Sequence, residues 1–312
     1  MIDQEKNHKQ LTPASGGLLA ILGSICWGLS GSVGQYLFSV EGMDSRWLVP
    51  IRLGGAGLIL LLYSVLRYGP EKLQAPWRNS KHALELLIYG LPGVSACQFF
   101  YFLTIQLSTA STATILQDLS PLFVLAVLCI TQRRAPNGRE IFCIVLALTG
   151  VVLLTTHGSI QSLAVTPSAI LSGIISAVCV CIYTVAPKTI LSCYPVPLLQ
   201  GWSFLMGGVL LSLVFQPWTY SYVPTVPGLL GIGFVILVGN VLAFVLFMTG
   251  VHYAGPQKSN LYSFAEPLTA ALVSAVFLGS PFDIWDLTGF LMVFAMMLLL
   301  SGHGTKPMGE KR

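Results

Sequence analysis

Charge is scarce in this chain. Asp, Glu, Lys and Arg together make up 9% of its 312 residues, whereas an ordinary soluble domain carries about 25%. Hydrophobic residues make up 54% of the chain, and no soluble core is large enough to hide that much apolar surface. The shortage of charge therefore excludes a soluble protein and predicts an all-α polytopic membrane protein.

Signatures of catalysis are also missing. The five histidines are scattered over loops and span ends, and the sequence contains no HExxH, Walker A or GxSxG pattern. Six of the seven cysteines lie inside predicted spans, where we expect them to serve as apolar packing, so neither a metal site nor a disulfide is supported. We expect no enzyme, no cofactor and no metal. A membrane-embedded enzyme and a channel are the alternatives, although no sequence like a selectivity filter is evident.

Ten apolar segments are long enough to cross a bilayer, since a helix needs about 20 mostly apolar residues to do so. The predicted spans are 16–39, 47–66, 84–106, 110–130, 139–156, 168–187, 197–216, 228–250, 256–279 and 284–302. The connections are short and often marked by Pro or Gly, so none could house a soluble domain. We therefore expect one membrane domain with tails at 1–15 and 303–312.

Basic residues are unevenly divided between the two sides of this arrangement. With the N-terminus inside, fourteen of the sixteen Lys and Arg residues fall in cytoplasmic segments, Arg46 falls outside, and Arg52 lies within a span. One missed span would invert every later loop, so the asymmetry predicts that both termini are cytoplasmic. The N-terminal tail is polar, and we expect no cleavable signal. The expected location is the plasma or inner membrane.

The second half of the chain resembles the first in the order of its spans and the positions of its midspan prolines. A shift of 146 residues lays 93–154 on 239–300 without a gap and pairs Pro121 with Pro267. Because each half would hold five spans, an odd number, the halves would enter the membrane in opposite senses, as in many secondary transporters. We therefore predict two inverted five-helix repeats. The predicted repeats are 16–156 and 168–302.

Two carboxyl groups lie near the middle of predicted spans. Glu266 stands directly before Pro267 in the ninth span, and Asp118 stands three residues before Pro121 in the fourth. A carboxylate at mid-membrane costs at least about 2.5 kcal/mol, so each should face protein or water. Either they line a cavity, where they bind a substrate or exchange a proton, or they hold helices together. The prolines should kink both helices, as static bends or as points of movement during gating.

Further side chains are candidates for the wall of such a cavity. Arg52 is the lone basic residue clearly inside a span. It either pairs with a carboxylate, meets an anionic group of a substrate or snorkels to the interface. Amide and aromatic groups suit an amphipathic organic solute, although each is also an ordinary packing residue. These candidates are Tyr262, Gln98, Asn240, Trp27 and Tyr183.

Several stretches resemble the motifs of a known family. LSTASTATILQDLSPLFVLAVL (107–128) and AGPQKSNLYSFAEPLTAALVSAVFLG (254–279) each resemble the fourth-helix signature of an EamA domain, in which small residues precede a midspan Pro and an apolar run. CWGLSG (26–31) and AVCVCIYTVAPK (177–188) resemble its first-helix motif and the second-half counterpart. The chain is thus similar to the drug/metabolite transporter superfamily, near the amino-acid and metabolite exporters.

This resemblance implies a secondary transporter that moves a small organic metabolite across the bilayer by alternating access, with export as the expected direction. The expected partners are that small-molecule substrate, the lipid bilayer and protons as a candidate coupling ion. No nucleic-acid partner is expected, and the expected state is a monomer or a homodimer.

Overall fold

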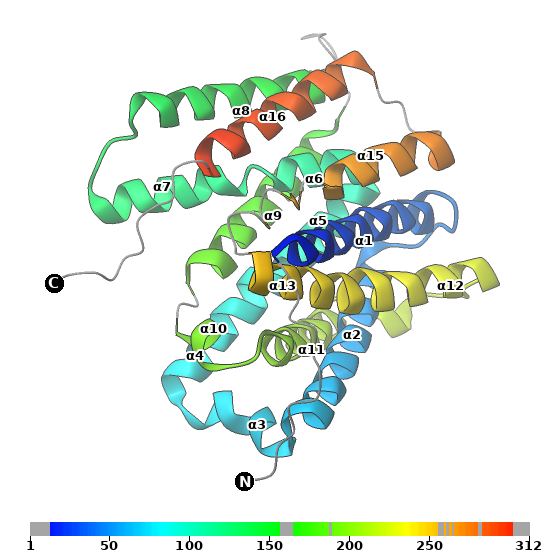
Figure 1. Cartoon of the computed structure of the whole chain (residues 1–312). Coiled ribbons are helices and arrows are strands. Elements are labelled where there is room, and N and C mark those ends of the chain that lie inside the picture. The colour runs from blue at the N-terminus through cyan, green and yellow to red at the C-terminus, as the bar shows by residue number, and fades with distance from the viewer. Residues whose placement is uncertain are drawn as a thin grey trace, which may run out of the picture.

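The computed structural model describes residues 13–156, 165–186, 189–254, 259, 262–263, 265–279 and 283–301, and its regular elements within these ranges are all helical (Figure 1). The elements in chain order are α1 Pro13–Ser39, α2 Ser45–Tyr68, α3 Pro70–Gln74, η1 Ala75–Arg78, α4 Ser80–Ile88, η2 Tyr89–Ser95, α5 Ala96–Leu107, α6 Ala110–Gln117, α7 Ser120–Gln132, α8 Gly138–Thr156, α9 Pro167–Val185, α10 Ile190–Cys193, α11 Val196–Phe215, η3 Pro217–Thr219, α12 Val226–Phe234, η4 Val235–Leu242, α13 Ala243–Ala254, α15 Ala265–Leu278 and α16 Ile284–Ser301.

Seven helical segments of the described chain are long and apolar enough to cross a membrane. Every predicted span overlaps a helix, and the spans outside those seven correspond to α8 and to the shorter apolar helices α15 and α16. The prediction of an all-α, multi-pass membrane protein is confirmed at this level. The count of ten spans stays a prediction.

Short polar residues begin several of the membrane helices. Asp44, Thr109, Thr166 and Thr225 each accept a backbone N–H at the start of α2, α6, α9 and α12, respectively. Such caps satisfy donors that the first helical turn leaves free. Asp44 also accepts from Nη2 of Arg46 at 2.8 Å. The hydrogen bonds from Arg46 hold the pKa of the Asp44 carboxyl below its ordinary value.

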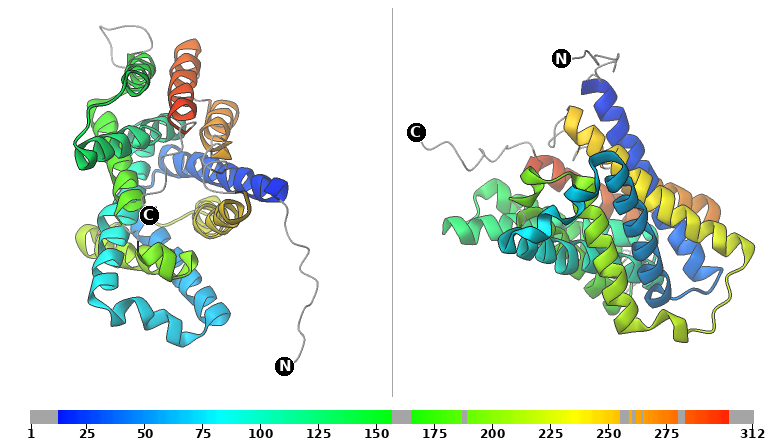
Figure 2. Two further views of the ribbon diagram at one scale, coloured as in Figure 1. Left: turned by 60° about the vertical axis from the view of Figure 1, so that its left-hand side comes forward. Right: turned by 90° about the horizontal axis from the view of Figure 1, so that it is seen from below.

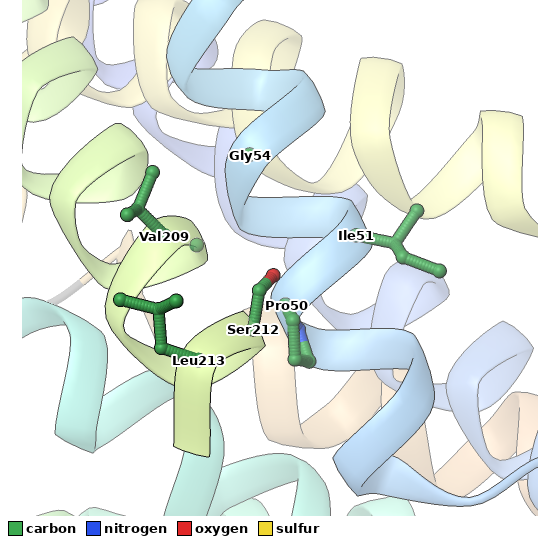
Figure 3. Close-up of a pocket in the computed structure, with 7 residues that line it drawn as sticks. Pro50, Ile51, Gly54, Val209, Ser212 and Leu213 are labelled. Atoms are coloured by element: carbon green, nitrogen blue, oxygen red, sulfur yellow. The ribbon is translucent and has the colours of Figure 1, made fainter. Parts of the chain in front are cut away.

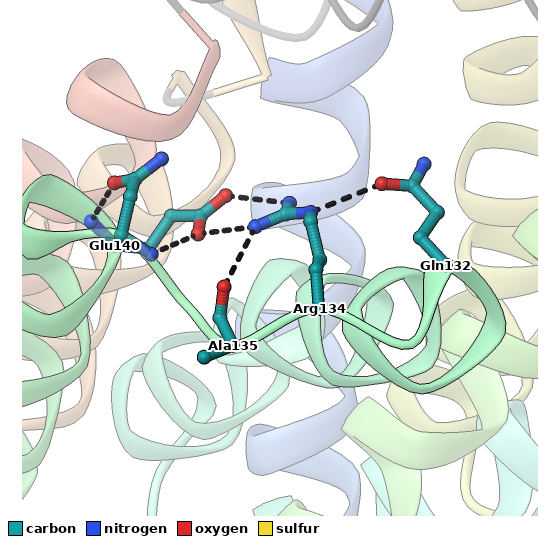
Figure 4. A network of polar contacts seen from close by, with 5 residues as sticks. Gln132, Arg134, Ala135 and Glu140 are labelled. Carbon is teal, nitrogen blue, oxygen red and sulfur yellow. Dashed lines mark hydrogen bonds and ion pairs between the residues drawn. The ribbon is translucent and has the colours of Figure 1, made fainter.

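The turn between α7 and α8 is held by a bidentate ion pair (Figure 4). Arg134 donates from Nη1 and Nη2 to the two carboxylate oxygens of Glu140 at 2.7 and 2.8 Å, and from Nε to Gln132 at 3.0 Å. Glu140 and Asn137 accept each other's backbone N–H, which caps the start of α8. Arg134 and Glu140 therefore neutralise each other within this turn.

The helices pack in pairs that are related by exchange of the two halves of the chain. Helix α1 of the first half packs on α13 and α15 of the second half, and α9 of the second half packs on α5, α6 and α7 of the first half. Three pairs join equivalent spans of the two halves: α2 with α11, α6 with α15, and α8 with α16. Figure 1 shows α8 beside α16 at one end of the bundle, and Figure 2 shows α1 running along α13. Exchange of the halves therefore maps one set of contacts onto the other.

The interface of α2 with α11 depends on glycines. A Cβ added at Gly57 would lie 2.4 Å from the backbone nitrogen of Leu205, and one at Gly208 would lie 2.5 Å from the backbone nitrogen of Gly54. The two backbones could not approach this closely with side chains between them. Small residues are the usual means of close helix contact in membranes, where the lipid is as apolar as the side chains.

A single methyl group at this interface should therefore destabilise the bundle. We expect Gly57→Ala to lower the Tm of the detergent-purified protein, because the backbone of α11 must shift at a cost of about 1–3 kcal/mol. The matched control is Gly233→Ala on α12, where an added Cβ meets nothing within 4 Å. Equal Tm values for the two variants would contradict the glycine-dependent contact.

Candidate functional site

The fourth and ninth spans are interrupted at their acids. Helix α6 ends at Gln117 and α7 begins at Ser120, so Asp118 lies in the break. Helix α15 begins at Ala265, which places Glu266 in its first turn. We predicted kinks at Pro121 and Pro267, and the structure places these prolines in the first turns of α7 and α15. A proline is tolerated in the first turn of a helix, where its missing N–H would have no partner in any case.

The two acids share one environment. Helix α6 packs on α15, and Glu266 and Asp118 are both half-buried. The Glu266 carboxyl lies within electrostatic reach of Asp118 and of the Tyr101 hydroxyl, and Tyr183 on α9 lies within reach of both acids. The N-terminal position of Glu266 on α15 also favours negative charge there through the helix dipole. The structure therefore places Asp118, Glu266 and Tyr183 within electrostatic reach of one another. Their role as the wall of a substrate cavity stays a prediction.

Helix α1 closes on this region through the CWGLSG motif. A Cβ added at Gly28 would lie 2.5 Å from the carbonyl oxygen of Glu266 and 2.8 Å from Cβ of Thr269. Glycine is therefore needed at position 28 for α1 to reach the break in the ninth span. Trp27 lies against Phe247 of α13, with ring centroids 4.9 Å apart, and Tyr262 lies against Gly17.

Arg52 is the centre of a second polar group. Its side chain is 2% exposed, so the snorkelling alternative is not what the structure shows. Nη2 donates to Oε1 of Gln98 at 3.1 Å and to Oδ1 of Asn240, and the guanidinium carbon lies 3.7 Å from the centroid of the Phe102 ring. The structure thus joins Arg52, Gln98 and Asn240, three residues that the sequence predicted only as separate candidates.

Tyr101 connects the two groups and was not among the predicted site residues. Its hydroxyl hydrogen-bonds Oγ1 of Thr114 at 2.9 Å, and it lies within electrostatic reach of Glu266, Asp118 and Arg52. Helical spacing could have indicated it, because Tyr101 follows Gln98 by three residues and so shares its face. No other feature of the sequence distinguishes Tyr101 from an ordinary aromatic residue of an apolar span.

A groove on the bundle lies apart from these polar groups. It runs between α2 and α11, has a volume of about 320 Å³, and is shown in Figure 3. Of the seven residues that line it, only Ser212 carries a polar side chain. The lining residues are Pro50, Ile51, Gly54, Gly208, Val209, Ser212 and Leu213. The groove therefore holds none of the predicted site residues.

Comparison with known proteins identifies the family. The model of the EamA-like transporter family matches residues 14–156 and again residues 167–302. The chain belongs to the EamA-like transporter family. The resemblance that the fourth-helix signatures indicated is therefore confirmed, and the family supports a transporter in preference to an enzyme.

Relatives of this EamA protein are named as transporters. The uncharacterized inner membrane transporter YicL of Salmonella typhimurium is 33% identical, over 92% of this chain and 95% of its own. The uncharacterized inner membrane transporter YedA of Escherichia coli is 24% identical, over 94% and 92% of the two chains. A solved crystal structure has the same fold, with a TM-score of 0.62 at 17% identity, over 92% of this chain and 96% of that one.

The amide of Asn240 should matter to stability. We expect Asn240→Leu to lower the Tm of the purified protein by several degrees, because an acceptor for the buried Arg52 is lost at a cost of about 1–3 kcal/mol. Asn240→Asp keeps an acceptor in the same place and should retain or raise the Tm. Equal destabilisation by both substitutions would contradict the acceptor role.

Proposed function

We propose that this EamA-family protein is a secondary transporter that moves a small organic metabolite, an amino acid or a related compound, across the membrane by alternating access. The observation that carries the proposal is the pair of interrupted helices that pack on each other with Asp118 and Glu266 at their breaks. Transporters place their substrate and ion sites at such discontinuous helices near the membrane midplane. Export remains the direction that the resemblance implies.

The proposed mechanism rests on two inverted repeats. Two features support them beside the family matches: the symmetric helix contacts and the π-helices η2 and η4. These begin at Tyr89 and Val235, 146 residues apart, the same offset that aligns the halves in sequence. In this mechanism one half rocks against the other, and the breaks before Pro121 and Pro267 are the points that bend.

The proposed binding region lies where the two polar groups meet. Glu266 and Asp118 would bind a polar group of the solute or exchange a proton with it, while Tyr183 and Gln98 would form the wall. Trp27, Tyr262 and Asn240 complete the proposed wall, the first two from the side of α1 through their contacts with Phe247 and Gly17. Both acids are half-buried, so part of each side chain is accessible.

Flux into proteoliposomes tests this proposal. A thermal-shift screen of the purified protein against a metabolite library comes first, because a true substrate stabilises the folded state. Saturable uptake or counterflow of a stabilising solute is the expected result. The absence of saturable movement for any amino acid or related metabolite would contradict the proposal.

Proton coupling through Glu266 is testable by substitution. We expect Glu266→Gln to slow flux at least about tenfold and to flatten its pH dependence, because the amide can neither carry a charge nor release a proton. The control is Glu71→Gln, an exposed carboxyl on α3, which should leave both unchanged. Wild-type flux with an unchanged pH profile in Glu266→Gln would end the coupling hypothesis for this residue.

From the distribution of basic residues we propose that both termini lie on the cytoplasmic side of the membrane. This orientation places Cys193, the exposed one of the seven cysteines, on the cytoplasmic side. A membrane-impermeant maleimide should therefore label Cys193 in inverted vesicles and not in intact cells. Val223→Cys, at a position that is 84% exposed in the next loop, should show the opposite pattern. Labelling of Cys193 from outside intact cells would reverse the proposed orientation.

A further inference from the structure

Within the described part of the chain, Arg52 is a buried charge that forms no ion pair with an acid. Arg46 pairs with Asp44 and Arg134 pairs with Glu140, and both of these ion pairs are at surface turns. Arg52 is 2% exposed, and its hydrogen-bond acceptors are the neutral amides of Gln98 and Asn240. An arginine stays charged in a protein, and a buried charge is costly unless an opposite charge or enough acceptors compensate it. The surroundings of Arg52 supply only part of that compensation.

The group has a surplus of donors. Nε and Nη1 of Arg52 have no hydrogen-bond partner among the described residues, and neither has Nδ2 of Asn240. Asn240 is 2% exposed, and its amide is already held beside the guanidinium through Oδ1. Buried donors are nearly always satisfied in native structures, so a cluster of unsatisfied ones indicates a missing acceptor. That acceptor must approach the same small region.

We infer that Arg52 and Asn240 form a binding site for an oxyanion, namely a carboxylate group of the transported solute. The inference rests on the proposed transport function and specifies one chemical group of its substrate. A carboxylate would place a negative charge beside the guanidinium, and its oxygens would accept hydrogen bonds from the free N–H groups. The planar guanidinium suits such a partner better than a lysine ammonium would.

A singly charged group fits this place better than a multiply charged one. Tyr101 lies within electrostatic reach of Arg52 and also of Glu266 and Asp118. The guanidinium carries one positive charge, so a monoanion neutralises it, whereas a dianion would leave a buried net negative charge. The acids would attract a cationic group at the other end of the solute.

The helices that hold the site are irregular. Asn240 lies within the π-helix η4, and Gln98 lies three residues after the π-helix η2. Single π-helical turns are rare and are often found at functional sites. Arg52 lies on α2 in the first half and Asn240 lies on η4 in the second half. A carboxylate bound to both would therefore contact both halves of the chain.

The test compares solutes that differ only in the carboxylate. The probes are L-amino acids, acetate and succinate, each beside its amide, with chloride and inorganic phosphate as further arms. Thermal stabilisation of the full-length protein in detergent reports binding. We expect at least one carboxylate to raise the Tm of the wild type while its amide does not.

Three variants connect that stabilisation to the site. Arg52→Gln removes the charge, and Asn240→Asp places an internal carboxylate beside Arg52 without loss of the acceptor. Both should weaken binding of the carboxylate at least about tenfold. The control is Arg46→Gln, which removes an exposed arginine and should leave binding unchanged. Because Asn240→Asp is expected to fold at least as stably as the wild type, loss of binding in this variant cannot be attributed to unfolding.

Three outcomes would overturn the inference. One is equal stabilisation by a carboxylate and its amide, and another is unchanged binding in Asn240→Asp. The third is stabilisation by chloride or phosphate and by no carboxylate. If saturable flux is found for a solute without a carboxylate and none is found for a carboxylate, this inference fails while the proposed transport function stands. If no solute shows flux, the proposed function fails first.

Discussion

A polar group inside a bilayer has no water to bind, and this constraint explains most of the structure. Serines and threonines within the spans bond the carbonyl four residues earlier, as Ser24, Ser64 and Ser203 do. Glycines allow backbones to meet where side chains would hold them apart. Several polar groups that cannot be satisfied within one helix lie around Tyr101. Among the buried side-chain atoms that have no hydrogen-bond partner in the described chain, those of Arg52 and Asn240 lie side by side and are therefore informative.

The interrupted helices follow from the same constraint. A break exposes backbone groups and is tolerated at membrane depth only where protein or an internal cavity receives them. Asp118 and Glu266 are at such breaks, on helices that pack on each other and on α1 or α9. The helix dipole at the start of α15 stabilises a negative charge on Glu266, and such a charge in turn stabilises the N-terminus of that helix. In the proposed transport mechanism, these breaks are the points that bend.

The sequence predicted the class, the family and much of the polar interior. Hydropathy and loop charge are strong signals, and the prolines and acids of the two signature stretches are visible as single letters. The grouping of Arg52 with Gln98 and Asn240 could not be predicted, because it depends on how α2, α5 and η4 cross in space. The π-helices were not predictable either, since one extra residue in a turn leaves no mark in hydropathy.

We propose that solute binds in the polar interior, between Arg52 and the acids at the helix breaks. The most direct measurement is an experimental structure of the full chain with the solute that the screen and the flux assay identify. The account predicts solute density in contact with the Arg52 guanidinium and with Glu266 or Asp118. Density seated in the groove of α2 and α11, with no solute beside these residues, would contradict it.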